Sequence, residues 1–322
     1  KKTMIRRNAR LRREYLYRRS VRSEERERLD RKIRIREALE KGLEISKEDV
    51  LAEAEEKEYG VEHTLNKARE ANLKKKGGIV EELDDEYREA TLHPPKILLT
   101  SSHSPSDPMH RFLGELNLVF PNSTRINRGN MDVKSLVKTA SIRGFSDIVV
   151  VHEYRGVPNA IQITHLPFGP TAYFSLYNVI MRHDTELNSK VSEAYPHLIF
   201  HNFRTKIGKR CATILKHVFP VPKEDSKRIM TFANDNDFIS FRHHTYKNVE
   251  GKIVLHEVGP RFEMQLYQIT LGTLDQEDAE REWVLRPYMN TAAKRQVLGL
   301  SKDALEEERI QELNKMTDED DV

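Results

Sequence analysis

The first part of the chain carries arginines and tyrosines in a pattern suited to holding a polyanion. Between residues 6 and 22 the single acidic residue is Glu14. Arginine presents a planar fork of donors that fits phosphate, and tyrosine offers a ring on which an unpaired base can stack. The pattern favours a basic arm that orders on RNA. The residues we expect to contact RNA there are Arg6, Arg7, Arg10, Arg12, Arg13, Tyr15 and Tyr17.

The alternative for this arm is a solvated charged helix. Opposite charges spaced i,i+4, such as Glu24–Arg28 and Glu27–Arg31, stabilise a helix by about 0.2–0.5 kcal/mol each without any partner. These pairs lie beyond residue 22, however, where acids and bases are balanced. The aromatic residues lie where the balancing acids are missing.

Further basic residues follow at expected turns, strand ends and one helix. As RNA contacts we expect Arg128, Arg155, Arg182, Arg242, His243 and Arg261 beside turns or strand ends, and Lys206, Lys209 and Arg210 on one helix face. For each residue alone, an ordinary surface charge is the competing interpretation. A scaffold that binds only protein is the rival function, and the apolar stretch PFGPTAYF would suit it.

Residues with catalytic or metal-binding chemistry are not grouped in a usable way. His152–Glu153 begins like a zinc-binding helix, but Gly156 stands at the second ligand position and the flanking DIVVVH predicts a strand. Cys211 is predicted to be a small buried hydrophobe. His243 and His244 are expected to alternate across a strand, one in and one out. We therefore predict no catalytic residue, no metal and no cofactor.

Charge is segregated along the 322 residues, one third of which are charged. Residues 1–36 carry 16 Lys and Arg against 5 Asp and Glu, whereas residues 37–93 carry 9 against 17. The last stretch, 301–322, is acidic as well. A strongly basic arm attracts polyanions by releasing their condensed counterions. With one cysteine, no apolar run of about 20 residues and no signal-like start, we expect a soluble intracellular protein that crosses no membrane.

Apolar periodicity predicts where the folded domain begins. Residues 4–41 predict a helix with almost no core-facing stripe, and 43–90 predict weak helix and linker. From Pro94–Pro95 short apolar segments alternate, which is typical of an α/β or α+β layered domain. We expect a basic helical arm and acidic linker over 1–93, a domain over 94–290, and an acidic tail over 291–322. Within the domain we expect strands at 96–100, 124–127, 147–152, 161–165 and 172–176, and helices at 109–120 and 133–142.

The second part of this domain echoes the first. Gly169–Pro170 opens GPTAYFSLY and Gly259–Pro260 opens GPRFEMQLY, with Leu-Tyr at the same offset in both. Such Gly-Pro pairs are expected to be structural turns that start a strand sharply. Val-Phe-Pro ends an expected helix at residues 119–121 and again at 218–220, each followed by a basic residue and a strand, at Arg125–Ile126 and Arg228–Ile229. We predict a duplication whose two halves pack across a central cleft.

With these segments the chain resembles the Brix-domain family over roughly residues 94–290. The resemblance rests on RINRG (125–129), HEYRGVP (152–158), LPFGPTAYFSL (166–176), IMRHD (180–184), PHLIFHNF (196–203), TFANDNDFISFRHH (231–244) and EVGPRFEMQLY (257–267). The arm RRNARLRREYLYRR (6–19) and the stretch EWVLRPY (282–288) narrow it to the family member of the small-subunit processome, the U-three snoRNP. Residues 43–90 show no motif.

The resemblance implies an α/β (α+β) fold: a duplicated Brix fold of two anticodon-binding-domain-like halves, preceded by the basic helical extension. It implies a non-enzymatic nucleolar protein that helps a guide snoRNA pair with pre-rRNA. The implied partners are pre-rRNA, the guide snoRNA, a processome phosphoprotein and a small companion resembling a ribosomal protein. The chain would be a monomer within a large complex.

Overall fold

The computed structural model describes residues 2–41, 49, 86–87, 93–184, 191–223, 225–249, 252–286 and 297–300. The chain divides into two compact units, Lys1–Glu89 and Ala90–Val322. The interpretation of residues 43–90 as weak helix and linker, and that of the tail from residue 301, lie almost wholly outside the described residues. No described helix is both long enough and apolar enough to cross a membrane.

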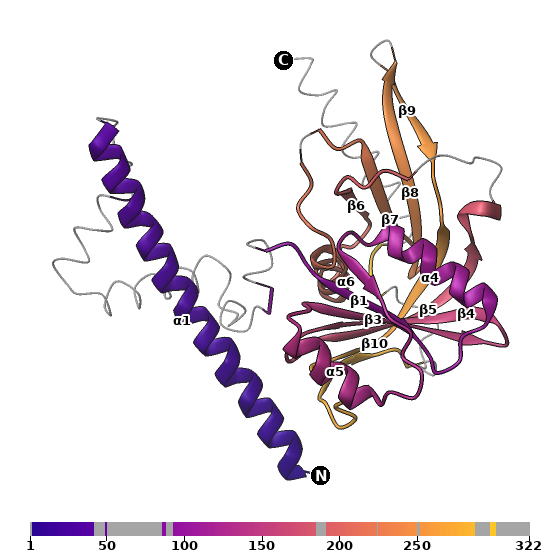
Figure 1. The fold of residues 1–322 in the computed structure, drawn as a ribbon, viewed down its shortest axis with the longest axis horizontal. Helices are drawn as coiled ribbons and strands as arrows, with labels where there is room; N and C mark the ends of the chain where they lie inside the picture. The colour runs from indigo at the N-terminus through magenta and orange to yellow at the C-terminus, as the bar shows by residue number, and fades with distance from the viewer. Residues whose placement is uncertain are drawn as a thin grey trace. The chain divides into compact units, whose positions relative to one another are not determined.

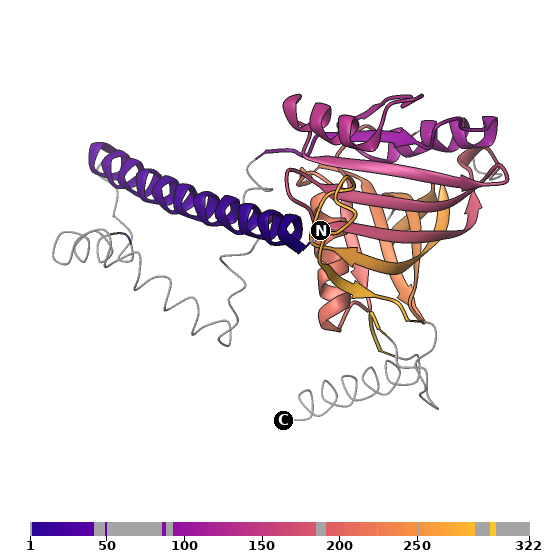
Figure 2. The same cartoon turned by 90° about the horizontal axis from the view of Figure 1, so that it is seen from below.

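The first unit is dominated by α1 (Lys2–Lys41), a single unbroken helix (Figure 2). Charged pairs one turn apart support it: Arg18 bonds Glu14 at 2.6 Å, and Arg36 bonds Glu40 at 3.1 Å. Large apolar side chains such as Leu29 and Leu39 remain exposed. The predicted helix is confirmed, as is the lack of a continuous apolar stripe along it.

The second unit alternates strands and helices as the sequence predicts. The first part contains β1 (Ile97–Ser101), α4 (Asp107–Val119), β2 (Ser123–Arg125), α5 (Val133–Ile142), β3 (Asp147–Tyr154), β4 (Val157–His165), β5 (Thr171–Ile180) and the short η1 (Arg182–Asp184). The second part contains β6 (His197–His201), α6 (Lys206–His217), β7 (Arg228–Asp235), β8 (Phe238–Val249), β9 (Lys252–Glu257), β10 (Arg261–Thr270) and β11 (Arg281–Val284).

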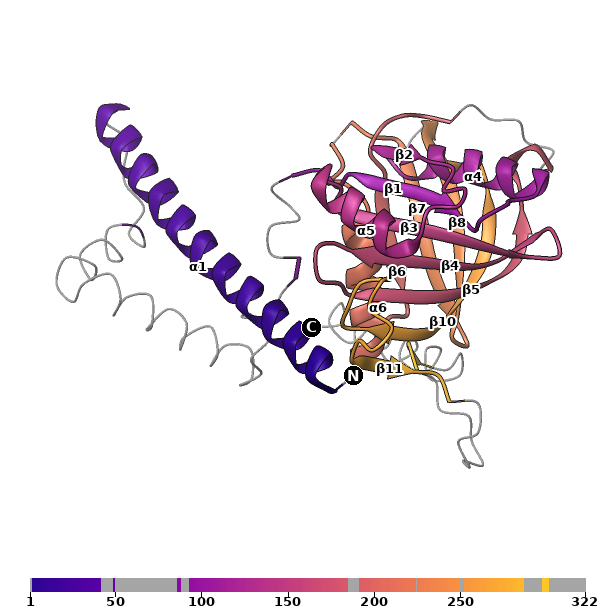
Figure 3. The same ribbon diagram turned by 60° about the horizontal axis from the view of Figure 1, so that its bottom comes forward.

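The strands form one continuous sheet of order β2-β1-β3-β4-β5-β10-β8-β7-β6, with β11 added to β10 and β9 to β8. Figure 3 shows β2, β1, β3, β4, β5, β10 and β11 in succession. β1 is parallel to β2 and β3, and β6 is parallel to β7. All other pairs are antiparallel. The β8–β9 ribbon projects beyond the body of the sheet (Figure 1).

The sheet order repeats about the central pair of strands. β1-α4-β3-β4-β5 corresponds to β6-α6-β7-β8-β10, and β5 pairs with β10 in the middle. The insertion of β2 and α5 into the first half accounts for its longer connection. One proposed equivalence is wrong: Arg125 ends β2 at the sheet edge, whereas Arg228 begins β7, the counterpart of β3.

The two Gly-Pro pairs begin these central strands, as predicted. Gly169 and Gly259 both have positive φ, +89° and +75°, and each is followed by a proline and then by the first residue of β5 or β10. Space is short as well: a Cβ on Gly169 would lie 2.6 Å from the carbonyl oxygen of Gly272. Glycine is therefore required by both backbone conformation and packing.

Phenylalanines join the two halves into one core. Phe120, after α4, lies 5.4 Å from Phe219, after α6, and contacts continue through Phe232 and Phe241 to Phe262, which α4 covers with Phe112. The space left among these side chains is about 20 Å³. The expected central cleft is therefore wrong for the described residues, because a continuous sheet and an aromatic core fill the junction.

The other face of the sheet is covered in the first half by α5. Leu136, Val137 and Ala140 of this helix pack with Ile148 and Val150 of β3 in a buried cluster. Asp132 caps the helix by accepting a hydrogen bond from the amide of Val133 at 2.8 Å. This layer leaves the neighbouring strands β4, β5 and β10 with polar and tyrosine side chains on the same face.

A short C-terminal segment, residues 297–300, binds the second half near the start of α6. The Asp237 carboxylate accepts hydrogen bonds from the amides of Val297 and Leu298 at 2.9 and 2.8 Å. The Asn202 amide group bonds both backbone groups of Leu300. Leu298 is 1% exposed. The folded unit thus includes residues beyond 290, the end expected from the sequence.

Candidate nucleic-acid interface

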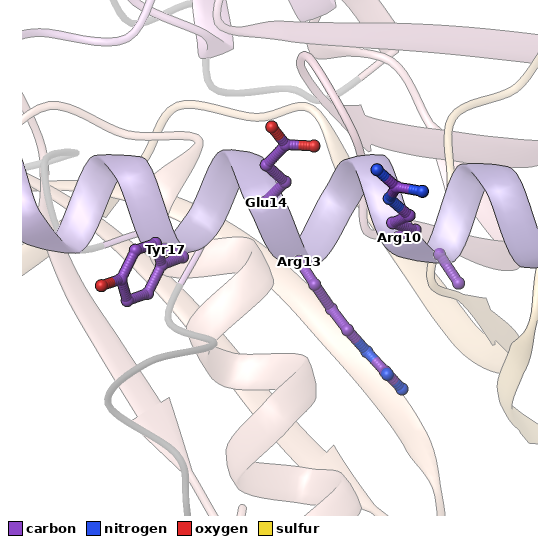
Figure 4. A pocket seen from close by; sticks show the side chains of 5 residues that line it. Arg10, Arg13, Glu14 and Tyr17 are labelled. Atoms are coloured by element: carbon purple, nitrogen blue, oxygen red, sulfur yellow. The ribbon is translucent and has the colours of Figure 1, made fainter.

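Helix α1 carries the first group of candidate contacts. Arg7, Arg10, Arg13 and Tyr17 are exposed, and Figure 4 shows Arg10, Arg13 and Tyr17 on successive turns with Glu14 among them. Residues spaced three or four apart are neighbours on a helix surface, so their charges add in one region. Tyr15 is half-buried. The side chain of Arg6 lies outside the described part of the structure.

Arg12 has a different role from its neighbours. Its guanidinium forms an ion pair with Glu86, whose side chain is buried, within the same unit. An arginine already neutralised by a buried carboxylate contributes little to phosphate binding. Arg12 therefore holds Glu86 against α1, and we do not expect it to contact RNA.

Helix α6 carries the second group of candidate RNA contacts. Lys206 and Lys209 are exposed on it, together with Lys216 two turns on. Thr205 caps the helix by accepting a hydrogen bond from the Gly208 amide at 2.9 Å. Arg210 is half-buried and pairs with Glu282 of β11 at 3.1 Å. The lysines are thus placed for phosphate contact, whereas Arg210 ties the helix to the sheet.

The sheet brings Arg242 and Arg261 together. β8 and β10 pair antiparallel with Phe241 opposite Phe262, and Arg242 and Arg261 are the residues next to this pair, on the side of the sheet away from the core. Like charges close together on neighbouring strands repel each other. Glu257 offsets part of this repulsion by pairing with Arg261 at 3.4 Å. The positive charge that remains at this place would favour the binding of an anion.

The three arginines at turns, Arg128, Arg155 and Arg182, make different contacts. Arg155 lies in the β3–β4 turn with a φ of +52°, its guanidinium 5.2 Å from the centre of the Tyr154 ring. The Arg182 amide donates to the buried carboxylate of Glu115 at 2.9 Å. Arg128 is close enough to His152 to lower the pKa of that imidazole, although burial is the larger cause. Of the three, Arg182 lies beside the start of β10, since a Cβ added at Gly259 would be 3.2 Å from the Arg182 Cα atom.

Among the predicted contacts whose side chains the structure describes, His243 is the one that is buried. It is 1% exposed, and its Nδ1 lies 2.7 Å from the Gly259 carbonyl oxygen. Arg228 donates from Nε to the His243 Nε2 atom at 3.0 Å. Burial, reinforced by the charge of Arg228, lowers the pKa of His243 to about 4. The expected RNA contact at His243 is wrong, because the ring belongs to the core, while His244 lies half-buried as the outer member of the pair.

Sequence reasoning missed Arg228, a buried arginine that joins the halves. Its guanidinium donates to the carbonyl oxygens of Leu118 and Val119 at the end of α4, at 2.6 and 3.2 Å. Desolvation lowers the pKa of Arg228 to about 10, so the group remains charged at neutral pH. A basic residue opening a strand gives no sign that it will reach a helix 110 residues earlier.

A tyrosine strip on the outer face of the sheet was missed as well. We use this name for Tyr173 and Tyr177 of β5, Tyr267 of β10 and Phe238 of β8. Ring centres of Tyr173 and Tyr267 are 5.8 Å apart, and those of Tyr177 and Phe238 are 5.6 Å apart. The alternation in TAYFSLY already places the two tyrosines of β5 on one face opposite Ala172, Phe174 and Leu176.

Groups able to hold a metal or a nucleophile are not assembled in the described part of the chain. No cluster of three His, Cys, Asp or Glu suited to a metal ion occurs among the described residues. Cys211 is fully buried on α6, as predicted, and burial raises the pKa of its thiol well above the usual range. A buried neutral thiol is inert toward substrates.

Comparison with known proteins accounts for this architecture. A family model described as the Brix domain matches residues 102–268. The chain is 48% identical over 297 residues to the "U3 small nucleolar ribonucleoprotein protein IMP4" of Bos taurus, which covers 91% of this chain and 98% of that protein. The chain belongs to the Brix family. The "Brix domain-containing protein ZK795.3" of Caenorhabditis elegans is 46% identical over 93% of this chain and 98% of its own length.

A fungal relative extends the same similarity. The "U3 small nucleolar ribonucleoprotein protein imp4" of Schizosaccharomyces pombe is 44% identical, covering 92% of this chain and 99% of that protein. The Brix match begins after β1 and ends within β10, so it spans both halves of the sheet. The relatives align over more than nine tenths of the chain, well beyond the Brix match.

Proposed function

We propose that the chain is a non-catalytic RNA-binding subunit of the small-subunit processome. In this role it assists pairing of the guide snoRNA with pre-rRNA and early processing of small-subunit rRNA in the nucleolus. Its partners would be pre-rRNA, the guide snoRNA, a processome phosphoprotein and a small ribosomal-protein-like companion. The observation that carries the proposal is the 48% identity, over 91% of the chain, to a protein named as a component of the U3 small nucleolar ribonucleoprotein.

The placement of basic residues supports RNA as the ligand. Arg7, Arg10 and Arg13 are exposed on α1, and Lys206 and Lys209 are exposed on α6. Phosphate contacts from such side chains supply affinity without sequence preference. Sequence selection would come from base pairing between the two RNAs, so a surface that holds backbones is sufficient for a protein that assists pairing.

Crosslinking in cells tests this function. The tagged full chain is crosslinked to RNA by ultraviolet light, and the bound RNA is sequenced. The proposal expects reads concentrated on a guide snoRNA and on pre-rRNA near the sites where the two RNAs pair. Reads spread over unrelated RNAs in proportion to abundance, with normal incorporation of the chain into the particle, would contradict RNA binding as its task.

A protein-binding scaffold remains the second candidate, favoured by one observation. The β8–β9 ribbon exposes consecutive apolar side chains, with Ile253 69% and Leu255 56% exposed. Replacing Ile253 and Leu255 by Ser would remove a protein-binding surface without touching α1 or α6. Loss of particle incorporation in this variant, with RNA affinity of the purified chain absent in the wild type, would establish the scaffold instead.

A further inference from the structure

The tyrosine strip offers a second kind of RNA contact, different from the basic helices. Its middle lies on β5 and β10, the two strands at which the repeated halves join. Tyr177 is 42% exposed and Phe238 37% exposed, whereas Tyr173 and Tyr267 are half-buried. Four residues along a strand span about 13 Å, so the Tyr173–Tyr267 and Tyr177–Phe238 pairs are separate ring platforms on one face.

Amide side chains lie among the rings. Gln162 stands opposite Tyr173 on β4, and Gln265 stands opposite Phe238 and Ser175. The Tyr177 hydroxyl donates to Gln265 at 3.4 Å. Hydrogen bonding to Gln162 opposes the rise in the Tyr267 pKa that burial causes. Amides and hydroxyls offer donors and acceptors that match the edges of bases.

Charge along this face separates the place for bases from the place for phosphates. Arg281 of β11 lies close enough to Tyr173 to oppose the rise in its pKa caused by burial. At the far end, Arg242 of β8 and Arg261 of β10 lie next to the paired Phe241 and Phe262. Between them the Glu263 carboxylate accepts a hydrogen bond from Asn178 at 2.9 Å. An acid in the middle repels phosphates, while cations at both ends attract them.

We propose that the tyrosine strip binds an unpaired segment of RNA by stacking bases on its rings, with phosphates held at the two arginine ends. The inference rests on the proposed function and specifies the form of RNA that this face binds. A single strand can place its bases on exposed rings, as two or three bases do on the sheets of common RNA-binding domains. In a duplex the bases stack on one another, so no base face is free to stack on the tyrosine strip.

Binding of an oligouridine of about ten nucleotides to the purified full chain tests the proposal. The informative variant is Tyr177→Leu, which removes a ring but keeps apolar bulk on an exposed position. The matched control is Tyr177→Phe, which keeps the ring and removes the hydroxyl. Phe238→Leu repeats the test on another strand if Tyr177→Leu fails to show a wild-type melting curve.

We expect Tyr177→Leu to weaken oligouridine binding by about five- to a hundredfold, the range expected for loss of one stacked base. Tyr177→Phe should bind within about twofold of wild type. The dependence of affinity on salt should be the same in all three proteins, since stacking releases no counterions. Binding of an RNA duplex of the same length should not change in either variant.

The possible outcomes distinguish failure of the stacking proposal from failure of the proposed function on which it rests. Wild-type affinity for oligouridine in both Leu variants, with salt-dependent RNA binding intact, would overturn the stacking proposal alone. Equal losses for duplex and single strand would overturn it too, because a general effect would then be responsible. If the wild-type chain binds neither RNA, the proposed function falls and the inference falls with it.

Discussion

The guanidinium of Arg228 donates a hydrogen bond to the carbonyl oxygen of Leu118 at 2.6 Å. The bond links the first strand position of β7 to the last turn of α4, and so joins the two halves of the repeat. Helix ends leave carbonyl groups without intrahelical partners, and a cation near them is favourable. Arg228 also contacts His243 and the Ala194 carbonyl, so a single side chain satisfies several buried groups.

Replacing Arg228 by Met should therefore destabilise the domain strongly. The variant keeps the volume but leaves buried carbonyl oxygens and the His243 ring without their donor. We expect a loss of about 2–5 kcal/mol in the free energy of unfolding. Urea unfolding followed by circular dichroism measures it. Arg242→Met on the outer face of β8 is the control, and a similar small loss in both variants would contradict the central role of Arg228.

Stability should fall below neutral pH because of His243. In the unfolded chain this imidazole takes up a proton below its ordinary pKa of 6.5, whereas in the fold it does so only below about 4. Its contribution is complete above pH 6.5 and is lost as the pH falls through that window to about 4. The total is roughly 3 kcal/mol.

His243→Gln isolates this contribution, because glutamine can accept from Arg228 but does not titrate. Between pH 7 and pH 4.5 the free energy of unfolding of the wild type should drop more steeply than that of the variant. Parallel curves for the two proteins would mean that the His243 ring is not the group that titrates. Comparing the two proteins removes the effect of the carboxylates they share.

Residues 297–300 should contribute to the stability of the domain. Leu298 is buried, and a Cβ added at Gly208 would lie 2.0 Å from the Leu298 carbonyl oxygen. We expect Leu298→Ala to cost about 2–4 kcal/mol, as for other buried leucines. Gly208→Ala should displace the segment.

Fragments give a second measurement of the same segment. A fragment of residues 94–300 should melt at a higher temperature than one of residues 94–290. Limited proteolysis of the full chain should leave a core that begins near Pro94. Equal melting temperatures for the two fragments would show that the domain ends by residue 290, as the sequence alone suggested.

Local sequence patterns predicted much of the fold. Helix α5 has the predicted bounds, and the Gly-Pro pairs start strands as expected, because turn chemistry and apolar alternation act within a few residues. The symmetric sheet order was foreshadowed by the repeated segments. The filling of the expected cleft was not foreshadowed, because the packing of Phe120 against Phe219 depends on where two distant helices end.

The candidate site was less predictable. Sequence alone could say that His243 and His244 alternate, but not which one enters the core. That Arg242 and Arg261 lie next to one paired position follows from the register of β8 and β10, which single-strand patterns do not reveal. Pairing of Arg12 with Glu86 joins the arm to an acidic stretch that carries no motif. Such long-range partners decide whether a basic side chain is available to RNA.

The most direct test of the RNA-binding account is the salt dependence of affinity. Purified full-length chain is titrated with single-stranded RNA at several salt concentrations. It is compared with a variant in which Arg7, Arg10 and Arg13 are replaced by Ala. Each phosphate contact on a single strand contributes about −0.7 to the slope of log K against log salt, so the variant should flatten the slope by up to about 2. Arg12→Ala, which breaks the ion pair with Glu86, should leave the slope nearly unchanged. An unchanged slope in the triple variant, with loss of a protein partner instead, would contradict RNA binding by α1 and favour the scaffold.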